Sequence, residues 1–387
     1  MPIREDSMSL VNGLKWYQVS NILACTWLLA SCGGSNGGGS VVETAPAYAY
    51  VANSVSLTTY SINPSTGGLT DSGGSPLTFP VSGPFGGVSQ IATDPSGQML
   101  YLLHYTGVHA YAINRNTGSL TAVAGSPFET GSIPISLAFD ASGTHLYVAG
   151  YSGAVAPVNT VISAYSVNSS GALTPLATYT LTSELSTVVR AGNYLYVAGY
   201  YTNSITAFSI GATGELTQNV AGSPFATDTG PYSIVVDPSG SVLYTANVGA
   251  STATEATPGS ISAFTMDSST GALTPVAGNP QSIPVQGAIS TDPMAEFLFV
   301  PETNGVSVYA IDTASGALSA VAGSPFSAGT KPNSVSIDPT NQIAYVVNGG
   351  SANVSEFTLG STGVLTPLAG SPVAVGSGPS YMIVASQ

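Results

Sequence analysis

The chain has 387 residues, of which 43% are apolar and only 6% are charged. Five Lys and Arg stand against nineteen Asp and Glu, which gives a formal net charge of −14 at pH 7. A surface of this charge repels polyphosphate backbones, so the composition excludes nucleic-acid binding. The apolar content, with regularly spaced aromatic residues, predicts a packed core and argues against disorder.

The N-terminal segment has the features of an export signal. Residues 19–31 are an apolar stretch interrupted by Asn21, which is too short to span a bilayer and is typical of a signal-peptide core. Two basic residues, Arg4 and Lys15, precede it, and either Met1 or Met8 can be the start. The sequence therefore predicts a signal peptide over residues 1–31.

The signal ends in a motif that points to lipid attachment. The run Leu29-Ala30-Ser31-Cys32 resembles the bacterial lipobox, in which a cysteine is acylated and becomes the new N-terminus. Residues 33–40 contain only Gly, Ser and Asn and form a flexible tether. We expect lipid on Cys32, a tether over 32–44 and an exported protein anchored in the cell envelope, on the periplasmic face or the cell surface. The alternative is an ordinary cleaved signal with an incidental cysteine.

Beyond the tether, one repeat of about 49 residues recurs seven times. It contains an apolar segment of the form Leu-Tyr-Val-Ala, whose aromatic residue recurs at Tyr50, Tyr101, Tyr147, Tyr196, Tyr244, Phe299 and Tyr345. A second alternating segment follows, with its aromatic at Tyr60, Tyr111, Tyr165, Phe208, Phe264, Tyr309 and Phe357. A Gly-x-Leu motif comes next, and six copies then close with Gly-Ser-Pro or Gly-Asn-Pro. A further apolar segment, such as residues 231–236, runs into the next repeat.

Each repeat thus predicts four short strands, here named A, B, C and D, joined by turn residues. Four strands per repeat, seven times over, predict an all-β, seven-bladed β-propeller over residues 45–387. The first repeat begins at strand B near Ala47, and the last is followed by a lone strand A over residues 379–384. We therefore expect the C-terminal strand to pair with the N-terminal blade and close the ring.

The repeat resembles a known family. Motifs such as Asp237-Pro238-Ser239-Gly240, the Leu-Tyr-Val-Ala segment and Thr-Gly-x-Leu-Thr are similar to those of the lactonase family of seven-bladed propellers. That family includes 6-phosphogluconolactonases and muconate-cyclising enzymes. The run Tyr50-Val51-Ala52-Asn53 is also similar to the YVTN-type repeats of surface-layer propellers. The resemblance implies a propeller fold and, as one activity, hydrolysis of a lactone ring.

Most of the conspicuous aspartates belong to the repeat. Five of them open the turn between strands A and B: Asp94, Asp140, Asp237, Asp292 and Asp338. We interpret these as turn formers, because Asp caps such a turn and they recur from blade to blade. Arg115 and Arg190 are expected in turns on the same side. His109, in strand C, and His145, at the start of strand B, are expected to be structural.

The other side carries the D–A and B–C loops, whose residues differ between blades. The ligand-binding candidates there are His104, Glu129, Asp228, Glu302, Lys331, Tyr151 and Tyr200. Glu184, Glu255, Tyr105, Tyr201, Asn247 and Asn348 accompany them. A lactone hydrolase needs a base that activates water, and His104 with Glu129 or Glu302 would supply it.

The sequence argues against a phosphorylated substrate, a metal and a cofactor. Binding of a phosphate usually takes clustered Arg or Lys, and Lys331 is the only basic residue expected on the loop side. Histidines are scarce, and no Asp-x-Asp-x-Asp-Gly run is present, so no metal site is predicted.

Two functions remain open at this point. The first is an envelope-anchored scaffold that binds a neutral small ligand, a glycan or a protein partner. The second is a lactone hydrolase that acts on an uncharged substrate through loop-side His and carboxylate groups. No single catalytic constellation in the sequence decides between them.

Overall fold

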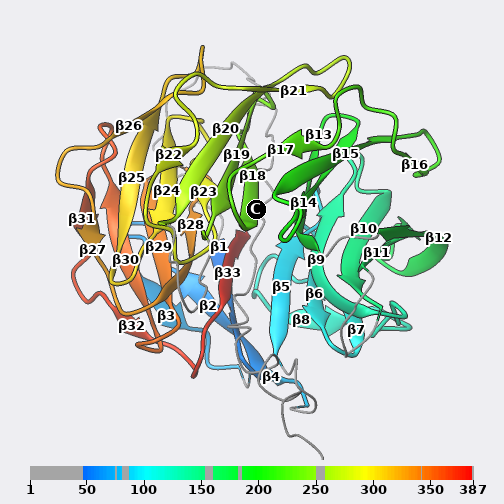
Figure 1. Ribbon diagram of the computed structural model, residues 1–387. Helices are drawn as coiled ribbons and strands as arrows, with labels where there is room; N and C mark the ends of the chain where they lie inside the picture. The colour runs from blue at the N-terminus through cyan, green and yellow to red at the C-terminus, as the bar shows by residue number, and fades with distance from the viewer. Residues whose placement is uncertain are drawn as a thin grey trace, which may run out of the picture.

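The computed structural model describes residues 47–74, 76–80, 87–152, 160–181, 185–249, 258–340 and 342–385. These residues form seven antiparallel sheets arranged as the blades of one ring (Figure 1), which confirms the predicted seven-bladed propeller. The expected signal peptide, Cys32 and the tether lie outside the described residues. The described part of the chain contains no helix long and apolar enough to cross a membrane.

The first three blades show the common plan of four strands. Blade 1 consists of β33 (Tyr381–Ala385), β1 (Ala47–Asn53), β2 (Ser56–Ile62) and β3 (Leu69–Asp71), with β4 (Leu77–Thr78) also paired to β2. Blade 2 consists of β5 (Val88–Thr93), β6 (Met99–His104), β7 (Gly107–Ile113) and β8 (Leu120–Ala122). Blade 3 consists of β9 (Ile133–Phe139), β10 (His145–Tyr151), β11 (Thr160–Val167) and β12 (Leu173–Leu181).

Blades 4 to 7, like blade 1, have a fifth, two-residue strand. Blade 4 consists of β13 (Leu185–Ala191), β14 (Tyr194–Gly199), β15 (Ser204–Ile210), β16 (Leu216–Thr217) and β17 (Phe225–Ala226). Blade 5 consists of β18 (Pro231–Val236), β19 (Val242–Asn247), β20 (Ser260–Met266), β21 (Leu273–Pro275) and β22 (Gln281–Ser282). Blade 6 consists of β23 (Ser290–Thr291), β24 (Phe297–Pro301), β25 (Gly305–Ile311), β26 (Leu318–Ala320) and β27 (Phe326–Ser327). Blade 7 consists of β28 (Pro332–Ile337), β29 (Ile343–Asn348), β30 (Asn353–Leu359), β31 (Leu365–Pro367) and β32 (Val373–Ala374).

The ring is closed by pairing between strands from the two ends of the described chain. The C-terminal β33 pairs antiparallel with β1, from Tyr48 opposite Ala385 to Ala52 opposite Tyr381. In Figure 1 the red β33 lies directly beside the blue β1. The predicted closure is therefore confirmed, and it leaves blade 1 with the same inner strand as every other blade.

The A–B turn aspartates cap their turns as expected. Asp94 Oδ1 accepts hydrogen bonds from the N–H groups of Gln98 and Met99, at 2.9 and 2.8 Å. Asp237 makes the same pair of contacts with Ser241 and Val242. The equivalent contacts recur at Asp140, Asp292 and Asp338. These carboxylates are occupied by the scaffold and are not available for chemistry.

The outer strand D is interrupted in most blades at the Gly-Ser-Pro or Gly-Asn-Pro motif. The chain leaves strand C there, and in blades 1 and 4 to 7 it returns as a separate two-residue strand. At the interruption, an N–H group of strand C has no backbone acceptor in strand D. The hydroxyl of the serine before the proline accepts its hydrogen bond instead. Ser126 Oγ accepts the N–H of Ala110 at 3.0 Å, and Ser223 Oγ accepts that of Ala207 at 2.9 Å. Blade 3 lacks the motif, and its β12 runs unbroken for nine residues.

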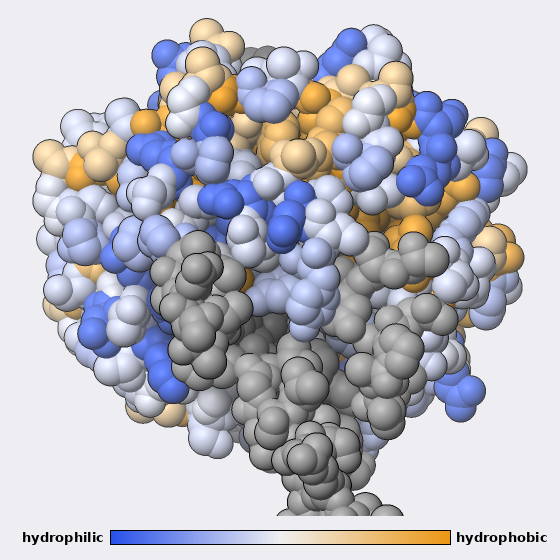
Figure 2. Space-filling view, viewed as in Figure 1, coloured by the Kyte–Doolittle hydropathy of each residue, from blue (hydrophilic) through white to orange (hydrophobic). Residues whose placement is uncertain are grey.

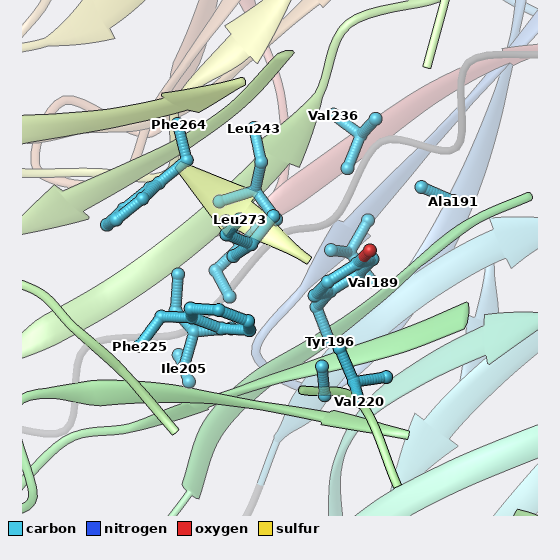
Figure 3. Close-up of a cluster of buried hydrophobic side chains, with 13 residues drawn as sticks. Val189, Ala191, Tyr196, Ile205, Val220, Phe225, Val236, Leu243, Phe264 and Leu273 are labelled. Carbon is cyan, nitrogen blue, oxygen red and sulfur yellow. The ribbon is translucent and has the colours of Figure 1, made fainter. Parts of the chain in front are cut away.

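Neighbouring blades pack face to face through apolar side chains. Figure 3 shows one such cluster, in which Tyr196 and Val189 of blade 4 meet Leu243, Phe264 and Leu273 of blade 5. Each blade buries its faces only against its two neighbours, so the core consists of inter-blade layers and the ring must close to bury all of them.

A repeated hydrogen bond links each blade to the next. The buried strand-B tyrosine of one blade donates its hydroxyl to a glycine carbonyl in the C–D turn of the following blade. The six pairs are Tyr50 to Gly118, Tyr101 to Gly171, Tyr147 to Gly214, Tyr196 to Gly271, Tyr244 to Gly316 and Tyr345 to Gly67, at 2.7 to 3.1 Å. Burial raises the pKa of these phenols, so they remain protonated donors. Blade 6 has Phe299 at this position and therefore has no such hydroxyl.

Phe299 provides a test of this link. We expect Phe299→Tyr to raise the free energy of unfolding by about 1 kcal/mol, because the added hydroxyl would meet the Gly363 turn of blade 7. The matched change Tyr244→Phe should lower it by about 1 kcal/mol, since it leaves the Gly316 carbonyl unpaired. Denaturant unfolding of both variants measures the effect. A Phe299→Tyr protein no more stable than wild type would show that the hydroxyl is not the operative contact.

Candidate functional site

The candidate residues lie on the face of the ring where strands A begin and strands B end, which we call the loop face. The pairing registers define it, since Val88 lies opposite His104 and Pro231 opposite Asn247. At the end of strand B, five blades carry a polar residue at the same position: Asn53, His104, Asn247, Glu302 and Asn348. The equivalent position is glycine in blades 3 and 4, at Gly150 and Gly199.

The asparagines at this position stabilise the B–C corner. Asn247 is 1% exposed, and its Nδ2 donates to Ser260 Oγ at 3.1 Å and to Ser262 Oγ at 2.9 Å. Asn348 is fully buried and donates to Ser355 Oγ at 2.9 Å. Because each amide links strand B to strand C inside one blade, we assign these two residues a structural role.

Blade 2 has a different arrangement at the same corner. His104 Nδ1 lies 2.9 Å from the Thr106 hydroxyl, and that hydroxyl lies 2.8 Å from His109 Nε2. One hydroxyl proton cannot serve two imidazole acceptors, so Thr106 donates to one ring and accepts from the other. The three side chains therefore form a hydrogen-bonded series. If one ring nitrogen donates its hydrogen to Thr106, the Thr106 hydroxyl must donate to the nitrogen of the other ring.

The sequence between the two histidines makes this contact possible. His104 ends β6, His109 lies in β7, and the two strands are joined by a tight turn over Tyr105 and Thr106. Gly107 adopts a φ of +129°, and a Cβ there would lie 2.2 Å from the Phe128 carbonyl oxygen. Only glycine satisfies both demands, so the turn is closed tightly enough to bring the rings to 5.6 Å between centroids.

The environment keeps both histidines neutral. The His104 side chain is 0% exposed, and its ring packs against Phe79 and Tyr105, with centroid separations of 5.5 and 4.3 Å. Burial lowers the pKa of His104, an effect partly offset by the Pro80 backbone. Burial, with the nearby His104, lowers the pKa of His109 to about 4. A neutral imidazole retains a lone pair, which is what a general base requires.

Asp228 lies in a second hydrogen-bonded group, at the entry to blade 5. Its Oδ2 accepts the Ser260 hydroxyl at 2.7 Å, and its Oδ1 accepts the Thr229 N–H at 2.8 Å. Ser260 also accepts from Asn247, so the carboxylate is joined to the B–C corner through that serine.

Glu302 and Lys331 share a corner between blades 6 and 7. The Glu302 carboxylate accepts the Ser307 hydroxyl from the neighbouring strand. The Lys331 N–H donates to the carbonyl of Thr303, the residue that follows Glu302, at 3.0 Å. Lys331 is exposed, and among the residues that the structure describes it is the one basic side chain on the loop face.

The remaining candidates are Glu129, Tyr151 and Tyr200. Glu129 is exposed, and its carbonyl accepts the Tyr165 hydroxyl at 3.3 Å. The Tyr151 hydroxyl donates to the Leu185 carbonyl at 3.1 Å, which links blades 3 and 4. Tyr200 is half-buried and packs edge-on against Tyr201, with ring centroids 5.0 Å apart.

The structure thus places the candidates on one face of the ring but does not bring all of them together. Glu302 and Lys331 share one corner, and Glu129 lies beside Gly107 in the corner of His104. The hydrogen bonds of Asp228 and Glu302 are to residues of their own corners and not to His104. Glu184 and Glu255 lie outside the described residues. Within the described ranges, no three His, Cys, Asp or Glu side chains gather in a group that could hold a metal ion.

One expectation needs correction, and another gains a contact that was not predicted. His109 lies in β7 as expected, and Thr106 connects it to His104. The spacing of His104, Thr106 and His109 across a Gly-containing hairpin was the signal that sequence reasoning missed. Arg190 is not in a turn: it is the penultimate residue of β13, where burial lowers its pKa. His145 keeps its structural assignment, because its Nδ1 lies 2.9 Å from Asp140 in the A–B turn.

Hydrophilic residues are dispersed over the face of the ring shown in Figure 2. In Figure 2 hydrophilic side chains are spread in small groups among weakly polar and apolar ones. The Arg115 guanidinium donates to the Ser96 carbonyl, which lies in the turn between strands A and B, away from the loop face. The described loop face therefore offers no cluster of cations for a phosphate.

Comparison with known proteins identifies the family. A family model described as lactonase, 7-bladed beta-propeller, matches residues 52–187 and 90–283. The chain belongs to this lactonase family. The two matched ranges overlap, as expected when a repeat can be aligned in more than one register. No curated protein sequence matches the chain.

Several solved structures have the same fold. The periplasmic gluconolactonase of Pseudomonas aeruginosa is 17% identical, with a TM-score of 0.71, and the match covers 88% of this chain and 99% of that one. A candidate 6-phosphogluconolactonase of Bacteroides uniformis is 16% identical, with a TM-score of 0.70 and the same coverage. A protein from Lactobacillus plantarum is 18% identical, with a TM-score of 0.68, covering 88% of this chain and 99% of that one. At these identities the comparison establishes the shared fold.

The His104–Thr106–His109 chain predicts a pH-dependent stability. The folded pKa of His109 is about 4, below the unfolded value of 6.5, so the unfolded state binds more protons between these values. The contribution of His109 to the stability of the fold is therefore fully present above about pH 6.5 and is lost as the pH drops toward about 4.

The measurement is denaturant unfolding from about pH 7 to about pH 4.5 for wild type and His109→Gln. We expect the variant to lose less stability over this range, because it has no imidazole to protonate. Parallel losses in the two proteins would contradict the assignment to His109.

Proposed function

We propose that this protein is an exported lactone hydrolase that acts on an uncharged lactone at the loop face, with His104 as the general base. The observation that carries the proposal is the neutral His104, aligned by Thr106 and His109, in a propeller of the lactonase family. The similarity to a periplasmic gluconolactonase supports hydrolysis over a binding scaffold, for which no specific observation speaks.

The proposed reaction needs one base and one water molecule. His104 Nε2 takes a proton from water as the water oxygen attacks the lactone carbonyl carbon, which gives a tetrahedral oxyanion. The oxyanion collapses, the ring C–O bond breaks, and the leaving alkoxide takes the proton from His104. The product is the open hydroxy acid. Because a single proton moves to His104 and back, the residue is restored after each cycle.

The neighbours of His104 act as positioning residues in this scheme. The scheme requires the tautomer in which His104 Nδ1 donates to the Thr106 oxygen and the Thr106 hydroxyl donates to His109 Nε2, because His104 Nε2 then keeps its lone pair for the reaction. No side chain of the described residues is hydrogen-bonded to His104 Nε2. The full burial of His104 implies that Phe79 and Tyr105 separate locally when substrate enters.

The charge of the loop face determines the expected substrate. A phosphorylated sugar lactone would bring two negative charges to a face where Lys331 is the single described cation, in a chain of net charge −14. We therefore expect a neutral lactone, such as a gluconolactone, to be hydrolysed in preference to its phosphorylated form.

A panel of neutral and phosphorylated lactones tests the proposal. We expect wild type to hydrolyse a neutral lactone and His104→Ala to lose about a hundredfold or more in kcat. Thr106→Ala should lower kcat less and shift its pH profile, because the tautomer of His104 is no longer held. His145→Gln, on the opposite face, is the matched control and should retain activity.

Three outcomes would count against this assignment. They are no turnover of any lactone, full activity in His104→Ala, or a preference for the phosphorylated substrate. The alternative is that Glu302 is the general base. If Glu302→Ala loses activity while His104→Ala keeps it, the base lies in the corner between blades 6 and 7.

The location of the protein is a separate part of the proposal. The lipobox-like run ending in Cys32 and the similarity to a periplasmic protein support export and anchoring through acyl chains on Cys32. We expect wild type in the membrane fraction and Cys32→Ser in the soluble envelope fraction after cell fractionation. A Cys32→Ser protein that stays with the membrane would exclude lipid on this cysteine as the anchor.

A further inference from the structure

A single glutamate is buried where the last blade of the ring packs against the first. Glu356 belongs to β30 of blade 7 and is 2% exposed. Val354, two residues earlier on the same face of the strand, packs with Tyr345 of blade 7 and Leu69 of blade 1 in one apolar layer, which we call the closure seam. In Figure 1 the orange strands of blade 7 stand beside the blue strands of blade 1.

The other blades have no ionisable group at this position. Glu356 lies in strand C directly opposite Tyr345, the strand-B tyrosine of its blade. The residues opposite the equivalent aromatic residues of blades 1 to 6 are Thr59, Ala110, Ala164, Ala207, Ala263 and Val308. The closure seam therefore contains a carboxyl group where the rest of the ring has small, uncharged side chains.

The Glu356 side chain joins the two blades directly. Its Oε1 accepts the Leu69 N–H at 2.6 Å, and Leu69 begins β3, the outer strand of blade 1. The equivalent N–H in blade 4, that of Leu216, meets the neutral hydroxyl of Tyr179 from blade 3 at 2.8 Å. The same contact between neighbouring blades is thus made by a neutral group at one seam and by a titratable group at the closure seam.

No cation compensates the carboxyl group. The ionisable groups on the elements packed here are all acids: Tyr345 of β29, Tyr60 of β2, Asp71 of β3 and Asp338 in the turn before β29. As the structure describes them, the strands of blades 1 and 7 contain no Lys, Arg or His. An ionised Glu356 is therefore a buried charge with one N–H donor and no counterion, which is costly.

The sign of the pH dependence follows from this environment. Burial raises the pKa of Glu356 above its ordinary value of 4.5, and the hydrogen bond from Leu69 offsets only part of the effect. The folded state therefore keeps a proton that the unfolded state loses as the pH rises above 4.5. The stability that Glu356 contributes is fully present below that pH and is lost as the pH rises through the folded pKa.

We propose that Glu356 is a pH-sensitive latch of the ring: its protonated form lets blades 7 and 1 pack tightly, and its ionisation as the pH rises loosens the closure seam. The effect has the opposite sign to that of His109, whose protonation weakens the fold as the pH falls. For a protein in the cell envelope, the location proposed above, the latch couples closure of the ring to the pH of the surroundings.

Denaturant unfolding between about pH 5 and about pH 8 tests the proposal with wild type and Glu356→Gln. Glutamine keeps an acceptor for the Leu69 N–H but cannot ionise. We expect the unfolding midpoint of the variant to rise relative to that of wild type as the pH increases. Because both proteins retain His109 and every other carboxyl group, the difference between their midpoints reports Glu356 alone.

Two further variants separate charge from packing. Glu356→Ala introduces the residue that four other blades have, and it should lose the same pH dependence although the Leu69 N–H then has no acceptor. Glu296→Gln, at an exposed glutamate of blade 6, is the matched control and should follow wild type at every pH. The proposal is wrong if Glu356→Gln and Glu356→Ala keep the pH profile of wild type.

Hydrogen exchange locates the effect within the ring. In wild type we expect the amides of residues 69–71 and 381–385 to exchange faster at about pH 8 than at about pH 5, after correction for the intrinsic rates. Those of residues 242–247, in blade 5, should not change, and Glu356→Gln should show no change at the seam. Equal acceleration in all blades, or none at the seam, would overturn the proposal.

Discussion

Ring closure is the constraint on which the rest of the structure depends. Each blade is a small twisted sheet that buries its faces only against two neighbours, so an open chain of blades would expose two apolar faces. The pairing of β33 with β1 removes both, by giving the first blade its inner strand from the last residues described. The side chains of the inner strands strengthen this closure, since Ser334 and Ser336 of β28 donate to carbonyls of Ser380 and Met382.

The same logic explains why most polar residues of the chain serve the scaffold. Turn aspartates cap their own turns, strand-B tyrosines bind the next blade, and serines before proline replace a lost backbone partner. These roles repeat because the geometry repeats. The blades depart from this pattern at His104, where blades 1, 5 and 7 have asparagine, and at β12, where the Gly-Ser-Pro excursion is missing.

The two departures differ in kind. At His104, an imidazole stands where three other blades have an asparagine amide, and Thr106 links it to a second buried imidazole, His109. At β12, the loss of an interruption creates a continuous edge. Neither departure alters the ring, because both lie at the periphery of a blade whose inner strands keep the common pairing.

The sequence by itself determined the blade number, the strand order, the closure by the C-terminal strand and the role of Asp94 and its equivalents. These features follow from local rules that recur seven times, so each copy supports the others. Only the tertiary structure decided that Thr106 joins His104 to His109, that Arg190 belongs to a strand, and that Asp228 and Glu302 lie in other corners than His104. The physical reason is that period-2 alternation fixes the face on which a side chain lies, whereas contacts between loop residues depend on how tightly a hairpin closes and how neighbouring blades pack.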